Sequence, residues 1–145
     1  MRFELVDAII ERSAERIVTH KNVSAAEEYL QDHFPTFPVL PGVLMIESMV
    51  QAARALATAN DPKFGRHVLG GVRALKYGTF VRPGDTLRVE VTLEKVHEDG
   101  RLDFKGSGSV LRPEAGVGGE APTAVSGRFW LRAGRGGMKG VGDRV

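Results

Sequence analysis

The chain has 145 residues, a length that suits one domain with a substantial hydrophobic core. It contains no cysteine, which excludes disulfides, thiolate metal sites and a cysteine nucleophile. Its formal charge of +2 comes from residues 132–145, which hold four basic residues and one acidic residue, so the rest of the chain is close to neutral and a nucleic-acid partner is not expected.

The N-terminal part of the chain predicts two strands and a short helical turn. Residues 3–12 and 15–23 are partly apolar and β-branched, which favours strands. Residues 25–31 are predicted to form a helical turn, because Ser24 stands where an N-cap residue is favoured.

A long apolar helix is predicted over residues 42–59. It follows a loop over 35–41, whose three prolines lack backbone donors and exclude regular structure there. Apolar residues cover nearly the whole circumference of this helix, which predicts that it is buried nearly all round. Its polar residues Glu47, Gln51 and Arg54 follow the helical period and therefore share one face.

The C-terminal part switches to the period of two that is typical of half-buried strands. Apolar and polar residues alternate over 87–94, and further strands are predicted up to Leu131, with turns at 83–85 and 98–100. Residues 1–132 are thus predicted to form one α+β domain, a sheet of five or six antiparallel strands curled around the helix.

Two segments are predicted to lie outside this regular structure. Residues 113–122 are rich in glycine and proline and are expected to form a flexible insertion within the last hairpin. Residues 133–145 are rich in glycine, basic and aperiodic, which predicts a disordered tail.

Residues 32–53 carry the chemistry that this sequence offers. His33 lies in the proline-rich loop, and imidazole is the natural base at neutral pH, although a lone histidine is more often structural. Glu47 lies on the apolar helix, where an ionised carboxylate is costly unless it is paired. Glu47 is therefore either a carboxylate held by Gln51 or Arg54, or a protonated carboxyl that acts as a general acid, because burial disfavours the charged form.

Gly42 stands at the predicted start of the helix, where the first amide groups have no partner inside the helix. One interpretation is a glycine that serves the tight turn after Pro41. The other is an amide that donates to a substrate carbonyl oxygen, because a glycine lets a ligand approach the backbone closely.

The residues from His33 to Gln51 resemble the signature of the FabZ-type β-hydroxyacyl-acyl-carrier-protein dehydratases, which is close to H-F-P-G-x-P-x-x-P-G-V-L-x-x-E-x-x-x-Q. Every fixed position is matched except the glycine after Phe34 and Pro35, where this chain has Thr36. A weaker resemblance covers most of residues 3–132.

This resemblance implies a hot-dog fold and a lyase of fatty acid biosynthesis. The enzyme would remove water from a (3R)-3-hydroxyacyl thioester to give the trans-2-enoyl product. The resemblance implies that His33 takes the C2 proton and that Glu47 delivers a proton to the departing hydroxyl. Gly42 and Val43 would bind the thioester oxygen, and Gln51 would orient Glu47.

Three further residues are candidates to line an acyl channel. Thr36 replaces the family's glycine and is expected to narrow the channel or to alter substrate choice. Phe37 and Tyr77 are aromatic residues that could line or gate it. Packing in the hydrophobic core is the alternative for both, and the sequence does not separate the two interpretations.

The resemblance also implies the partners. The substrate would be carried by an acyl carrier protein or by coenzyme A, and its phosphopantetheine would arrive with it, so no metal or resident cofactor is expected. The family forms homodimers or trimers of dimers in which the acidic residue faces the histidine of the other chain. No apolar run reaches the roughly 20 residues that span a bilayer, and the N-terminus has no signal-like apolar segment, so a cytoplasmic protein is expected.

Two other functions stay open at this point. A thioesterase of the same hot-dog fold would use its carboxylate on water and release a free thiol, which a thiol-release assay detects. A non-catalytic subunit that binds acyl thioesters is the second alternative. The presence of both His33 and Glu47 argues against it, and Thr36 argues mildly for it.

A basic run holds Lys63, Arg66, Arg73, Lys76 and Arg82. A solvated face is the favoured interpretation, and docking of an acidic carrier protein is the functional one.

Overall fold

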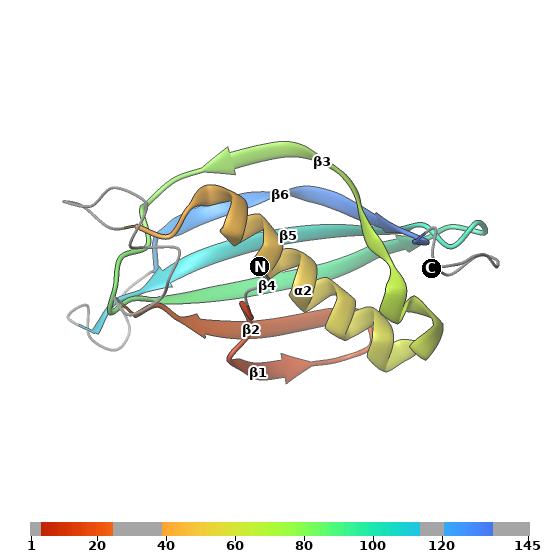
Figure 1. The fold of residues 1–145 in the computed structure, drawn as a ribbon, viewed down its shortest axis with the longest axis horizontal. Helices are drawn as coiled ribbons and strands as arrows, with labels where there is room; N and C mark the ends of the chain where they lie inside the picture. Colours follow the sequence, from red (N-terminus) through yellow and green to blue (C-terminus); the bar gives the residue numbers. More distant parts are fainter. Residues whose placement is uncertain (1–3, 25–38, 114–120, 135–145) are drawn as a thin grey trace.

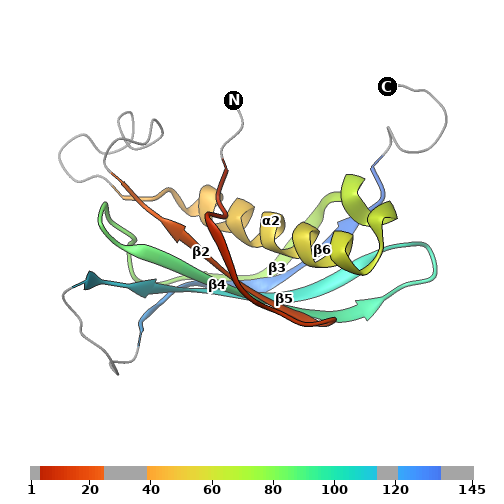
Figure 2. The same ribbon diagram turned by 90° about the horizontal axis from the view of Figure 1, so that it is seen from below.

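The computed structural model describes residues 4–24, 39–113 and 121–134. Its elements follow in the order β1 (Ala8–Arg12), β2 (Arg16–Asn22), α2 (Gly42–Asn60), the short 3-10 helix η1 (Pro62–Arg66), β3 (Val68–Tyr77), β4 (Thr86–Val96), β5 (Leu102–Leu111) and β6 (Thr123–Arg132). The strands form one antiparallel sheet in the order β1-β2-β4-β5-β6-β3. The sheet curves around α2, which lies along its concave face (Figure 1, Figure 2). The predicted α+β hot-dog architecture is confirmed.

Alternation along the central strands builds the core between the sheet and α2. Over residues 87–91 of β4 and along β5 every second residue is buried on the side of the helix, and the residues between them face outward. The rings of Phe104 and Phe129 stack on neighbouring strands with centroids 5.4 Å apart. Met49 and Leu56 of α2 are fully buried against this layer.

Helix α2 matches the predicted range at its first residue and extends one residue further. Pro41 is its N-cap, and its φ of −60° suits the entry into a helix. After Asn60, Asp61 is extended and Pro62 follows, which prevents the helix from continuing. The expectation of burial all round is wrong, because Val43 is 69% exposed and the face of Glu47, Gln51 and Arg54 is only half-buried.

Strand β3 was not among the expected strands. Its sequence contains adjacent glycines and its pairing with β6 shifts register twice, with Ala74 at a φ of +53°. The bulges break the alternation that marks a strand. Gly71 serves a close approach, since a Cβ there would lie 2.3 Å from the ring of Trp130. Figure 1 shows β3 arching along the edge of the sheet beside β6.

Several predictions fall outside the described residues. These are the helical turn at 25–31, most of the loop at 35–41 and of the insertion at 113–122, and nearly all of the tail at 133–145. The first predicted strand is shorter than expected, since β1 begins at Ala8.

Candidate active site

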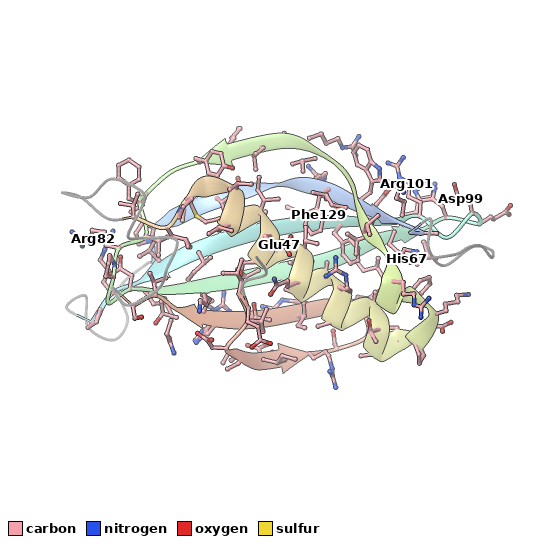
Figure 3. All side chains as sticks on the ribbon, viewed as in Figure 1. Glu47, His67, Arg82, Asp99, Arg101 and Phe129 are labelled. Atoms are coloured by element: carbon pink, nitrogen blue, oxygen red, sulfur yellow. The ribbon has the colours of Figure 1, made fainter. Side chains whose placement is uncertain are left out.

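Two turns of helix α2 carry the described part of the candidate site. His33, Thr36 and Phe37 lie outside the described residues, so the structure shows only what surrounds Glu47, Gly42 and Tyr77. Figure 3 shows Glu47 on α2, above the concave face of the sheet.

Glu47 receives a hydrogen bond from the side chain one turn further along the helix. Gln51 donates from Nε2 to Glu47 Oε2 at 3.2 Å. The amide of Gln51 is itself held, because its Oε1 accepts the backbone N–H of Leu5 at 2.8 Å. Since that oxygen faces a donor, the NH₂ group must face the carboxyl. The chain before β1 thereby fixes the direction in which Gln51 points.

A second contact anchors the same segment to the helix. The hydroxyl of Ser48 donates to the carbonyl oxygen of Leu5 at 2.8 Å, and both residues are buried. Sequence reasoning missed Leu5 and Ser48. The one available signal was a serine within the apolar part of the helix. Leu5 and α2 are therefore joined by two hydrogen bonds, one from the Leu5 N–H group and one to the Leu5 carbonyl oxygen.

Arg54 was the other partner considered for Glu47. The structure places its guanidinium elsewhere, since Nε donates to the carbonyl oxygen of His67 at 3.0 Å. Of the two candidates, Gln51 is the one beside the carboxyl.

Gly42 is the first residue of α2 and lies against an aromatic ring. A Cβ at this position would come within 2.8 Å of the ring of Tyr77, so no other side chain fits unless that ring moves. Pro41 provides no side-chain cap, and its carbonyl already accepts the N–H groups of Leu44 and Met45. The amide groups of the first helical residues have no acceptor inside a helix and are available to a ligand.

An apolar cavity of about 320 Å³ opens at this end of the helix. Gly42, Met45 and Tyr77 line it together with the loop that follows β3. Tyr77 is 51% exposed, yet its hydroxyl lies close enough to the protein that desolvation raises the pKa of Tyr77 above its usual 10.0. Apolar walls and convergent backbone donors are typical of a site for an acyl chain.

The structure brings Gly42 and Tyr77 together but does not bring Glu47 to them. Glu47 is absent from the described wall of the cavity, and its position is about 200° around the helix from Met45, which does line that wall. Val43, the residue after Gly42, is exposed to solvent and is absent from the described wall of the cavity. One chain therefore presents the carboxyl and the cavity on different sides of α2.

Two of the three described histidines, His67 and His97, have structural partners. His67 is buried, its Nε2 donates to the carbonyl oxygen of Gly100 at 2.7 Å, and Phe64 contacts its ring edge-on. His97 bonds Asp103 through Nε2 at 2.8 Å. Within residues 4–24, 39–113 and 121–134, no three His, Cys, Asp or Glu side chains are grouped so that they could hold a metal ion. In the same part of the chain, no helix is long and apolar enough to cross a membrane.

Comparison with known proteins gives consistent matches. Residues 1–114 match the FabA-like domain. The chain is similar to a 3-hydroxyacyl-[acyl-carrier-protein] dehydratase FabZ of Oenococcus oeni, with 44% identity over 98 residues, 66% of this chain and 70% of that protein. It is 34% identical to the protein of the same description from Clostridium perfringens over 125 residues, which cover 85% of this chain and 88% of the relative.

A solved structure shares the fold at low sequence identity. A chain of the dehydratase heterocomplex ApeI:P from Xenorhabdus doucetiae superposes with a TM-score of 0.70 at 21% identity, covering 90% of this chain and 83% of that one. At this identity the likeness concerns the fold alone.

Proposed function

The chain belongs to the FabA-like domain family as a FabZ-type 3-hydroxyacyl-[acyl-carrier-protein] dehydratase, a hydro-lyase of fatty acid biosynthesis, and from that premise we propose how its residues divide the reaction. The substrate is a 3-hydroxyacyl thioester. The C2–H and C3–O bonds break, the C2–C3 double bond forms, and the hydroxyl leaves as water after receiving a proton.

Stabilising the thioester oxygen is the role that we propose for Gly42 and Val43. Loss of the C2 proton builds negative charge on that oxygen, and preorganised amide donors at a helix N-terminus stabilise such charge. The observation that carries this proposal is the apolar cavity that meets the helix start at Gly42. Tyr77, in the wall of the same cavity, would contact the acyl chain.

Donating a proton to the departing hydroxyl is the proposed role of Glu47. Its hydrogen bond from Gln51, and the bond from Leu5 that holds Gln51, support a carboxyl kept in one orientation. A positioned acid contributes about 10²- to 10⁴-fold to such a step. His33 would remove the C2 proton, and this assignment is supported by the sequence motif alone.

The complete site would use two copies of the chain. Glu47 and the cavity lie on different sides of one α2, so a second protomer must supply the carboxyl to a given cavity. Strand β3 is an edge strand of the sheet, and exposed edges tend to be covered or joined. We propose a homodimer, alone or as part of a trimer of dimers.

The acyl group would arrive on an acyl carrier protein or on coenzyme A, with the phosphopantetheine as part of the substrate and no resident cofactor. The decisive experiment is an absorbance assay of enoyl-thioester hydration and of the reverse dehydration, across chain lengths and with both carriers. Release of free thiol, followed in parallel, would reveal thioester hydrolysis and would contradict the assignment if it exceeded dehydration.

A further inference from the structure

The outer face of the sheet, away from α2, carries a second hollow with a volume of about 410 Å³. It lies over strands β3 to β6, and its wall combines polar side chains with small residues. The side chains that define it are Lys76, Thr92, Lys105, Ser107, Ser126 and Arg128. The residues of β4, β5 and β6 among them alternate with the buried core positions of their strands, which places them on the face opposite the helix.

Strand register gathers cations at this hollow. Lys105 of β5 is directly opposite Arg128 of β6, and Arg128 is directly opposite Arg73 of β3. Like charges directly opposite one another destabilise a sheet. Arg73 lies outside the wall of the hollow, whereas Lys76, Lys105 and Arg128 line it, and these three cations favour an anion that would lie between them.

The nearby carboxylates of Glu90 and Glu94 do not neutralise all of these cations. Glu94 contacts Arg128 at 3.2 Å. Glu90, at the rim of the hollow, is held by Arg16 at 2.8 Å, and this hydrogen bond lowers the pKa of Glu90 below its usual 4.5. Among the described residues, the ammonium groups of Lys76 and Lys105 have no hydrogen-bond or ion-pair partner.

We propose that this hollow binds the phosphate monoester of a small hydroxylated molecule. The ammonium groups of Lys76 and Lys105 and the guanidinium of Arg128 would donate to the phosphate oxygens, which are strong acceptors of charge-assisted hydrogen bonds. The hydroxyl groups of the ligand would bond Ser107 and Ser126 and the carboxylate of Glu90. An ionised Glu90 favours a ligand with such donors over a bare anion.

The hollow is separate from the apolar cavity. Lys76 lines the hollow and the next residue, Tyr77, lines the cavity, so the two spaces flank β3 from opposite sides of the sheet. The proposal does not depend on the assignment of the catalytic roles.

Calorimetric titration of the full chain tests the proposal with two probes that both carry a phosphate monoester on a sugar. Ribose 5-phosphate represents a free metabolite, and coenzyme A carries a ribose phosphate monoester on a thioester carrier. Ribose without phosphate and inorganic phosphate are the reference probes, all at matched ionic strength. We expect ribose 5-phosphate to bind with a Kd below about 1 mM and each reference probe to bind more weakly.

Variants locate the binding. Lys105→Gln is expected to weaken binding of ribose 5-phosphate at least about tenfold, because it removes one charge-assisted donor. Lys63→Gln is the matched control, since Lys63 lies on η1 and outside the hollow, and binding should be unchanged. Ser107→Leu keeps every charge but fills the hollow, and it should also weaken binding. Circular dichroism shows whether each variant is folded, and Lys76→Gln replaces Lys105→Gln if the latter is not.

Amide chemical shifts of residues 105–108 and 126–128 should move on titration with ribose 5-phosphate. Absence of saturable binding would overturn the proposal, as would equal binding by wild type and Lys105→Gln. Shifts confined to the surroundings of Gly42, with coenzyme A as the only probe that binds, would assign the phosphate to the substrate site and also overturn it.

Discussion

Gln51 and Glu47 lie one turn apart on α2, and the amide of Gln51 donates to Glu47 Oε2 at 3.2 Å while its oxygen accepts the backbone N–H of Leu5. The segment before β1 therefore acts on the carboxyl through a single side chain. If Glu47 is the acid of the reaction, its orientation depends on a contact between Leu5 and Gln51, which are 46 residues apart in the sequence.

Replacing Gln51 with alanine should lower kcat by about one to two orders of magnitude, because Glu47 loses the donor that orients it. The free energy of unfolding should also fall by about 1–3 kcal/mol, since the Leu5 N–H loses its acceptor. Ser48→Ala is the control: it frees the carbonyl of the same Leu5 without touching Glu47. We expect Ser48→Ala to change stability and not kcat. An equal loss of kcat in both variants would show that Gln51 acts only by holding the N-terminal segment.

His33→Ala and Glu47→Gln should each reduce turnover by at least about two orders of magnitude, the scale expected for acid–base groups. Glu47→Gln keeps the shape of the side chain and its position beside Gln51, so thermal unfolding should change little. Steady-state dehydration of a 3-hydroxyacyl thioester measures the effect. Turnover near the wild-type rate in either variant would refute the role assigned to that residue.

Gly42→Ala should raise KM, because its new Cβ would lie 2.8 Å from the ring of Tyr77 and push that ring into the cavity. Tyr77→Ala removes the ring and makes room. The double variant should therefore reverse part of the rise in KM that Gly42→Ala causes, a coupling that a double-mutant cycle measures. Additive effects would mean that the methyl group acts on the substrate directly and not through Tyr77.

The elements that the sequence predicted are those with an undisturbed local pattern. Helix α2 was predicted within one residue, because its apolar period is long and Pro41 and Pro62 mark its ends. The contact of Gln51 with Glu47 followed from helical spacing. Strand β3 was not predicted because its glycines and bulges remove alternation, and the two glycines have a tertiary reason, the close approach of the Trp130 ring.

The parts of the site that the sequence did not reveal depend on long-range contacts. Leu5 reaches Gln51 and Ser48 only because the chain before β1 folds back onto the helix. The exposure of one face of α2 was likewise not predicted, because it also depends on tertiary structure. Its apolar composition predicted burial, but one sheet covers only one side of a helix.

The pKa of His20 gives the fold a predictable response to acid. Burial, and then the positive charge of Arg88 directly opposite on β4, lower the pKa of His20 below its usual 6.5. Because the folded pKa is depressed, the unfolded chain binds more protons just below pH 6.5. Stability should be fully present above that pH and should decline as pH falls through the window beneath it.

Urea unfolding at about pH 7.5 and about pH 5.5 measures this decline. His20→Gln cannot titrate and should lose less stability between the two conditions than wild type. His97→Gln, in the turn that follows β4, is the matched control. An identical pH dependence in wild type and His20→Gln would rule out His20 as the source.

The last prediction concerns assembly. Glu47 lies on the side of α2 away from the cavity, so activity should belong to a dimer in which each protomer completes the other's site. His33→Ala protein and Glu47→Gln protein should each be nearly inactive alone. After subunit exchange, a mixed dimer contains one site with both groups intact. Random pairing puts about half of the dimers in the mixed state, so roughly a quarter of all sites should regain activity. Mass spectrometry counts the mixed dimers independently. Mixed dimers without recovered activity would show that His33 and Glu47 of the same chain form the site.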